Sequence, residues 1–195
     1  LIVTGVQTCA LPILSIFDYP IEWIPQNPQW HNYLDIWSRV ALPTYYLNTI
    51  KVTSLTTVLQ LSVCGLAAFA FAKIQFPGRN TLFLMYLATM MVPYQVMMIP
   101  QFILIRNLGL SDTHLALILV NGFSPFGVFM LRQFFLSVPN ELLEAARVDG
   151  MNEFGIFFKV AMPLAKTGFV SLGILTFLTI WNDFLIPLVF ISSNN

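Results

Sequence analysis

The segment 137–163 places charged, small and helix-breaking residues at spacings that suit contact with another molecule. Ser137 or Asn140 can cap a helix here, and Pro139 suits its first turn. Gly150 is the expected end of that helix, because glycine adopts a left-handed backbone more easily than other residues. A second short helix can follow, so the segment predicts a helix–turn–helix.

The first of these helices is predicted to have one small apolar face. Leu142, Ala145 and Ala146 are spaced i, i+3 and i+4, which puts them on the same side of a helix. Glu144 lies near the positive N-terminal end of the helix. Such a face suits packing against another protein, but it also suits a connecting loop that rests on its own bundle. These residues leave both interpretations open.

The sequence has no residue pattern typical of catalysis or metal binding. Its two cysteines, Cys9 and Cys64, form no ligand cluster, and its two histidines stand alone. It contains no phosphate-binding P-loop and no zinc-protease or serine-hydrolase motif. We therefore predict no catalytic residue, no metal and no cofactor bound by this chain.

Five polar residues within long apolar stretches are candidates for a translocation path: Gln95, Asn121, Ser124, Asn182 and Asp183. Asp183 is the acidic residue inside such a stretch, and a charge at the centre of a bilayer costs about 2.5–3.5 kcal/mol. It should therefore face protein or water. It either contacts a solute with Asn182, or it lies in the outer headgroup zone because of its late position in the stretch.

Composition indicates that lipid surrounds the elements that hold these residues. The 195 residues are 57% hydrophobic and 9% charged, whereas a typical soluble domain is about 25% charged. So few charges cannot cover a water-soluble globule. The 9 basic and 9 acidic residues cancel, so no net field attracts nucleic acid and no such partner is predicted.

Four apolar stretches reach the length of about 20 residues that a membrane helix needs. They cover about residues 47–72, 81–105, 113–131 and 166–190. Pro93 and Pro100 should bend the second stretch. The sequence therefore predicts an all-α fold, a polytopic helical bundle in the membrane.

The distribution of basic residues predicts the orientation of this bundle. The loops 73–79 and 132–166 hold two and four of the 9 Lys and Arg residues, and short cytoplasmic loops collect such residues. Both loops should face the cytoplasm, and residues 106–112 should face outward. Residues 14–46, rich in proline and tryptophan, predict an external loop near the lipid surface.

The first thirteen residues are predicted not to belong to the native protein. Residues 3–13 resemble the in-frame translation of a common sequencing-library adapter. The native chain would then begin near Leu14, and Cys9 would carry no meaning. The alternative is that the apolar residues 10–16 end a first transmembrane helix.

The spacing within 137–163 resembles the EAA loop of ABC importer permeases. The matching residues are Glu144, Ala145, Ala146, Gly150, Val160, Met162 and Pro163. The family has isoleucine and leucine where this chain has Val160 and Met162. Residues 76–79, 129–135, 146–150 and 181–183 resemble the carbohydrate-type branch, and the resemblance covers about residues 23–195.

The resemblance implies a permease subunit in the inner (plasma) membrane of a bacterium or archaeon. It would move a sugar or related solute that an extracytoplasmic solute-binding protein delivers. It would pair with a second permease subunit and with cytoplasmic ATPase subunits, which bind the ATP. The implied type I importer permease fold has about six spans, of which this chain shows about four.

The same resemblance implies roles for the matching residues. Glu144 would contact a basic residue of the ATPase, and Ala145 and Ala146 would allow close approach. Gly150 would set the angle between the two short helices, and Pro163 would position the last span.

Other classes of membrane protein explain the sequence less well. A secondary transporter needs ionisable groups within its spans, and this chain offers Asp183 alone. A membrane enzyme needs a nucleophile–base pair or a metal cluster, which is missing. A scaffold without transport is disfavoured by the loop spacing. The solute itself stays open, because the binding protein could set all selectivity.

Overall fold

The computed structural model describes residues 41–191. The chain divides into two units, Leu1–Asn48 and Thr49–Asn195; apart from the start of α3, the features discussed below belong to the second. The predictions for residues 1–13 and for most of the external loop 14–46 lie outside the described residues.

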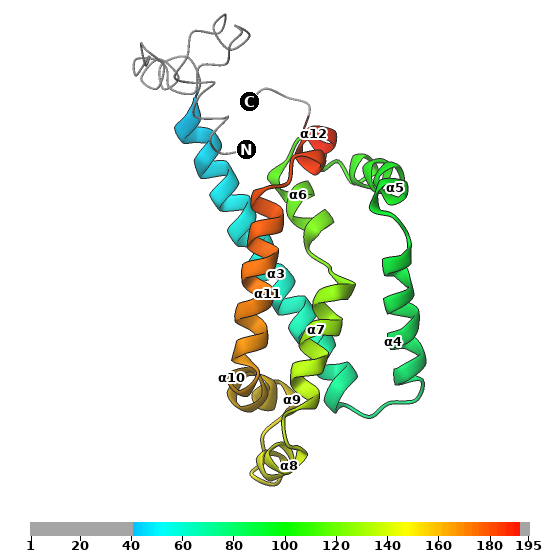
Figure 1. The fold of residues 1–195 in the computed structure, drawn as a ribbon, viewed down its shortest axis with the longest axis vertical. Helices are drawn as coiled ribbons and strands as arrows, with labels where there is room; N and C mark the ends of the chain where they lie inside the picture. The colour runs from blue at the N-terminus through cyan, green and yellow to red at the C-terminus, as the bar shows by residue number, and fades with distance from the viewer. Residues whose placement is uncertain (1–40, 192–195) are drawn as a thin grey trace, which may run out of the picture. The chain divides into compact units, whose positions relative to one another are not determined.

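Every regular element between residues 41 and 191 is helical, with the labels of Figure 1. The elements are α3 (Leu42–Lys73), α4 (Arg79–Ala88), η2 (Thr89–Met91), α5 (Tyr94–Asn107), α6 (His114–Asn121), α7 (Pro125–Leu136), α8 (Asn140–Val148), α9 (Glu153–Ile156), the π-helix η3 (Phe157–Ala161), α10 (Met162–Leu164), α11 (Lys166–Trp181) and α12 (Leu185–Phe190).

Helix α3 is the one helix of the described chain that is long and apolar enough to cross a membrane by itself. Its 32 residues rise about 48 Å, more than the ~30 Å hydrocarbon core. The sequence predicts a loop up to residue 46, and this boundary is wrong, because α3 begins at Leu42. Pro43 lies in the first turn, where the missing N–H costs no hydrogen bond.

The predicted span 81–105 consists of two helical segments that meet at a sharp angle. Arg79–Met91 and α5 are bent by 100°. The break lies at Val92 and Pro93, whose ψ angles of 119° and 135° are extended, as expected for a residue before proline and for a helix cap. The bend predicted at Pro93 is confirmed, while α5 continues through Pro100.

The predicted spans 113–131 and 166–190 are also interrupted. Helices α6 and α7 are bent by 50°, and the Ser124 hydroxyl starts α7 by accepting the N–H of Gly127 at 3.1 Å. Helix α11 ends at Trp181, before the separate α12. If each bent pair counts once, the described residues hold up to four segments that could cross a membrane, which is the predicted number.

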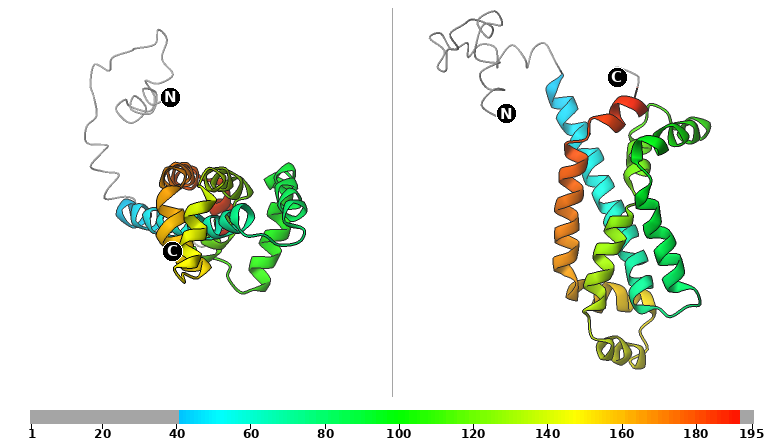
Figure 2. Two further views of the ribbon diagram at one scale, coloured as in Figure 1. Left: turned by 90° about the horizontal axis from the view of Figure 1, so that it is seen from below. Right: turned by 45° about the vertical axis from the view of Figure 1, so that its right-hand side comes forward.

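The helix ends gather in two groups. In Figures 1 and 2 the connection between α3 and α4 lies at the same end of the bundle as α8, α9 and α10. Helices α5, α6 and α12 gather at the opposite end. The charge pattern predicts that loops 73–79 and 132–166 share one side and that 106–112 lies on the other, and the structure confirms this relative placement.

The core near α8 is built from aromatic rings on four helices. Phe69 of α3 lies 5.5 Å from Phe157 of η3, and Phe135 of α7 lies 5.9 Å from Phe169 of α11, measured between ring centroids. Both pairs meet edge to face, a favourable geometry for aromatic rings. The segment Glu153–Leu164 is therefore packed directly on three of the long helices.

Candidate functional site

Helix α8 ends in a turn that requires glycine. The N–H of Met151 donates to the carbonyl of Ala146 at 3.0 Å, and the N–H of Gly150 donates to the carbonyl of Arg147 at 3.0 Å. This pair of bonds is the Schellman motif. The φ angle of Gly150 is +83°, a region that costs energy for any residue with a Cβ. The predicted helix end at Gly150 is confirmed.

Helix α8 has one buried and one exposed face. Leu143 and Ala146 are only 1% and 5% exposed and belong to the core, whereas Leu142 and Val148 are 47% and 88% exposed. Ala145 is also exposed. The predicted common face of Leu142, Ala145 and Ala146 is wrong at Ala146, because the register turns this residue inward with Leu143. The helix thus rests on its own bundle and presents a second face outward.

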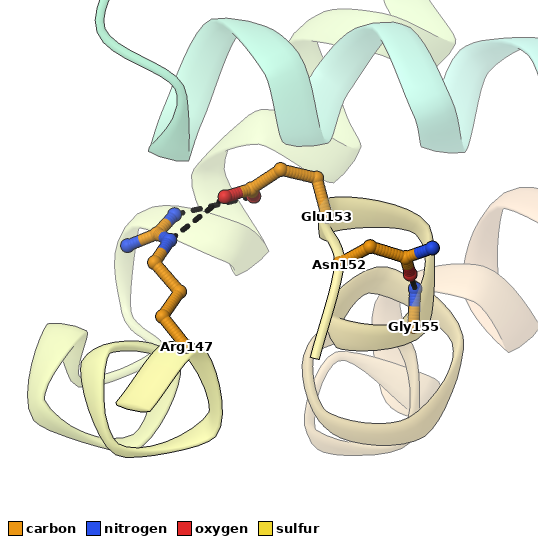
Figure 3. A network of polar contacts seen from close by, with 4 residues as sticks. All are labelled: Arg147, Asn152, Glu153 and Gly155. Carbon is orange, nitrogen blue, oxygen red and sulfur yellow. Dashed lines mark hydrogen bonds and ion pairs between the residues drawn. The ribbon is translucent and has the colours of Figure 1, made fainter. Parts of the chain in front are cut away.

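An ion pair joins α8 to α9 (Figure 3). The Nε of Arg147 donates to Oε1 of Glu153 at 2.7 Å, and Nη2 donates to Oε2 at 3.2 Å. This hydrogen bond and the nearby charge raise the pKa of Arg147 above its ordinary value. The side chain of Asn152 caps α9 by accepting the N–H of Gly155 at 2.7 Å. These contacts and the Schellman turn at Gly150 join the two helices.

Lys73 connects the end of α3 to the start of α8. Its Nζ donates to the carbonyl of Val138 at 2.6 Å and to Oδ1 of Asn140 at 2.7 Å. A cleft of about 430 Å³ adjoins this contact, and Glu144 lines it together with Lys73 and Arg79. The exposed carboxylate of Glu144 therefore shares a cleft with basic groups of its own chain.

The last three residues of the motif lie in the helical segment that follows α8 and α9. Val160 and Met162 are half-buried and pack against the aromatic core. Pro163 is exposed in the first turn of α10. It lies just before the bend of 81° between Glu153–Leu164 and α11. Proline has no backbone N–H and cannot donate a helical hydrogen bond.

The candidate path residues do not all come together. Asn121 and Ser124 line one cavity of about 520 Å³, next to the break between α6 and α7. The side chain of Asn121 also donates to the carbonyl of Leu117 at 3.3 Å. Gln95 and Asn182 are exposed and do not line this cavity. Asn121 and Ser124 therefore share a site, whereas Gln95 and Asn182 lie apart from it.

The side chain of Asp183 stabilises the start of α12 by hydrogen bonds. Its Oδ1 accepts the N–H of Leu185 at 3.1 Å and the N–H of Ile186 at 3.3 Å. Both donors lie in the first turn of α12, where a carboxylate is a favourable cap. This geometry favours the interpretation of Asp183 as a residue at a helix end.

Five polar residues that the sequence does not single out line the same cavity as Asn121: Gln60, Tyr94, Gln101, Thr176 and Thr179. They come from α3, α5 and α11, which are far apart in the chain. A lone glutamine or threonine in an apolar stretch gives no signal in the sequence, since threonine usually bonds its own helix backbone.

Comparison with known families identifies the chain. The family described as "Binding-protein-dependent transport system inner membrane component" matches residues 40–195. The chain belongs to this family. The match covers every described helix, including the α8 turn and the α6–α7 break beside the 520 Å³ cavity.

Curated relatives of this inner membrane component are named as permease proteins of transport systems. The chain is 38% identical over 184 residues to the arabinooligosaccharides transport system permease protein AraQ of Halalkalibacterium halodurans, covering 94% of this chain and 64% of that protein. It is 34% identical to the sn-glycerol-3-phosphate transport system permease protein UgpE of Pectobacterium atrosepticum, covering 98% and 70%. The predicted resemblance to carbohydrate-type ABC importer permeases is confirmed.

A solved structure supports the same fold. A chain of a bacterial ABC transporter involved in the import of the acidic polysaccharide alginate superimposes with a TM-score of 0.83 at 26% identity, covering 97% of this chain and 66% of that chain. The inner membrane component described here therefore has part of the type I importer permease fold. It spans about two thirds of the length of these relatives.

Proposed function

We propose that this chain is a permease subunit of an ATP-binding-cassette importer that moves a sugar or related solute across the inner membrane. Membership of the inner membrane component family supports the membrane location. The names of the two relatives, which refer to transport of arabinooligosaccharides and of sn-glycerol 3-phosphate, support the solute class. The protein is multi-pass and belongs to a bacterium or archaeon.

The two faces of α8 carry this proposal. The inner face is fixed to the bundle through Leu143 and Ala146, while Val148, an apolar residue at 88% exposure, points away from it. An exposed apolar face on a rigidly held helix suits docking to another protein. We assign the outer face, with Leu142, Ala145 and Val148, to a cytoplasmic ATPase subunit, and Glu144 to a basic residue of that subunit.

The contacts that join α8 to the rest of the bundle would transmit a movement of the ATPase to the membrane helices. The Arg147–Glu153 pair joins α8 to α9, and Phe157 packs on Phe69 and Phe135 of the long helices. Lys73 links α8 to the end of α3. Because each contact joins α8 to a rigid element, a displacement of α8 would move α3, α7 and α11 with it.

The remaining partners follow from the same proposal. ATP binds to the ATPase subunits and is hydrolysed there, so this chain binds no cofactor and is not an enzyme. An extracytoplasmic solute-binding protein delivers the solute. Exposed apolar side chains on α4, such as Leu84 at 64% and Met85 at 62% exposure, would face lipid or a second permease subunit. The basic residues of the loops 73–79 and 132–166 support a cytoplasmic location of the α8 end.

The test is co-purification of the ATPase with the complete transporter that contains this chain. Val148→Glu places a charge on the outer face of α8, and Val148→Leu keeps the face apolar. We expect the first variant to release the ATPase and the second to retain it, with the two permease subunits still paired in both. Equal retention by the two variants would refute the assignment of this face.

A further inference from the structure

Two adjoining cavities of opposite character lie at the end of the bundle that holds α8. The first is the cleft of about 430 Å³ beside Lys73, which is lined by positive and negative side chains. The second is a groove of about 250 Å³ between α3 and the segment 153–157, and its lining is apolar apart from Glu153. Ile74 and Glu153 line both cavities. A charged cleft therefore adjoins an apolar groove.

The apolar groove follows α3 from this end of the bundle toward the middle of the membrane. Leu66 lines the groove and lies two helical turns before Lys73, about 10 Å along the helix axis. One leaflet contributes about 15 Å of hydrocarbon. Leu66 and Phe154 are 38% and 66% exposed, so the groove is open on its outer side. An open apolar groove at this depth suits the acyl chain of a lipid.

The charged cleft offers groups of both signs to a ligand. Arg147 and Glu153 already form an ion pair at 2.7 Å (Figure 3). Lys73 and Arg79 donate to carbonyl and amide oxygens and form no ion pair with any described residue. Both keep further N–H donors, because an ammonium has three and a guanidinium five. Glu144 likewise forms no ion pair with the described residues, so cations and a carboxylate face the same cleft.

This combination of charges suits a lipid headgroup that carries both a phosphate and an ammonium. Lysine and arginine side chains at the ends of membrane helices bind lipid phosphates. A carboxylate binds a primary ammonium through charge-assisted hydrogen bonds. A choline headgroup has no N–H to donate, and a glycerol headgroup has no positive charge. An ethanolamine phospholipid satisfies both requirements.

We propose that the cleft and the groove together bind one ethanolamine phospholipid. Its phosphate contacts Lys73 and Arg79, its ammonium contacts Glu144, and one acyl chain lies against Leu66 and Phe154. A carboxylate has two oxygens and accepts several hydrogen bonds, so Glu144 can contact the ammonium together with a basic residue of the ATPase. The lipid site depends on the membrane location of the helices and not on the solute.

The experiment uses the complete transporter in nanodiscs of phosphatidylcholine. Three preparations contain the same small fraction of a photoactivatable phosphatidylethanolamine, phosphatidylcholine or phosphatidylglycerol, each with its reactive group on an acyl chain. Mass spectrometry measures the labelled fraction of the peptides that line the groove, from α3 and α9.

Two variants of the site have matched controls elsewhere in the chain. Arg79→Gln removes a charge from the cleft, and Arg106→Gln removes one from the last turn of α5 at the opposite end of the bundle. Leu66→Ala removes part of the groove wall. Leu55→Ala changes a leucine that is 48% exposed and lies outside the groove, on nearly the same side of α3.

We expect the phosphatidylethanolamine probe to label the groove several-fold more than either other probe. Arg79→Gln should lower this labelling about tenfold, because a charge-assisted hydrogen bond to the phosphate is lost. Arg79→Lys keeps the charge and should retain most of the labelling. Leu66→Ala should lower labelling about threefold, because apolar contact with the acyl chain is lost. Arg106→Gln and Leu55→Ala should label like the unaltered protein.

Four results would overturn the inference. Equal labelling by the three probes would show no headgroup recognition, and stronger labelling by phosphatidylglycerol would show a site for an anionic lipid. Unchanged labelling in both site variants would show that these cavities do not hold the lipid. No labelling of the groove by any probe would show that another subunit covers it. Loss of the ATPase from the unaltered assembly would instead contradict the proposed function, so the two failures are distinguishable.

Discussion

Replacing Gly150 by alanine strains the turn between α8 and α9 without creating a clash. A Cβ built on Gly150 meets no atom within 4 Å, so the whole effect comes from the φ angle of +83°. A left-handed backbone costs a residue with a Cβ about 1–2 kcal/mol. This energy lowers the population of the native turn relative to opened forms by roughly 5- to 30-fold.

The chain provides a closely matched control at the other end of the bundle. Gly109 has a φ of +70° and an equally open surrounding. It also ends a helix in a Schellman motif, because the N–H of Leu110 donates to Ile105 at 3.1 Å and the N–H of Gly109 donates to Arg106 at 3.0 Å. Gly109→Ala therefore introduces the same strain far from α8.

Hydrogen exchange and ATP hydrolysis in the complete transporter measure the consequences. In Gly150→Ala we expect the Met151 amide to exchange roughly 5- to 30-fold faster, and solute-stimulated ATP hydrolysis to fall. In Gly109→Ala we expect hydrolysis to stay near that of the unaltered protein. If both variants lose hydrolysis to the same extent, or if neither does, the α8 turn has no special part in coupling and the reasoning is refuted.

Two further predictions concern packing and charge. The Arg147–Glu153 pair is 38% and 44% exposed, so a double-mutant cycle with Arg147→Gln and Glu153→Gln should give a coupling energy below about 1 kcal/mol that shrinks in high salt; a larger, salt-independent value would contradict the exposed geometry. Gly168→Ala places a Cβ 2.5 Å from the Phe134 ring and should destabilise the protein by about 1–3 kcal/mol, seen as a lower melting temperature. Gly173→Ala, whose nearest contact is 3.4 Å, should melt like the unaltered protein.

Local chemistry made the turn and the breaks partly predictable from sequence. Gly150 ends α8 as predicted, since only glycine adopts the required φ without strain. Pro93 breaks its span as predicted. Ser124 and Pro125 also carry a helix-start signal, but they lie within a long apolar stretch. Mean hydropathy shows that such a stretch is long enough to span a membrane, and it does not show whether the helix is broken within the stretch. The described residues hold one uninterrupted spanning helix and up to four segments if each bent pair counts once, so the predicted continuity of the spans was wrong.

Long-range contacts could not be predicted from the sequence. Leu142, Ala145 and Ala146 satisfy helical spacing, yet the packing partner decides which side of α8 is buried, and it buries Ala146 with Leu143. The cavity likewise depends on how α3, α5 and α11 are placed. Gln101 and Thr176 lie far apart in sequence, so their shared cavity becomes visible only when the helices are assembled.

Site-specific cross-linking from α8 to the ATPase tests the central claim most directly. Val148→Cys places a thiol at an 88% exposed position and Leu143→Cys at a 1% exposed one on the same helix. In the complete transporter, a bifunctional thiol reagent should join Val148→Cys to the ATPase subunit and leave Leu143→Cys unlinked. A transporter that hydrolyses ATP but shows no cross-link from Val148→Cys, or equal cross-links from both positions, would contradict the account.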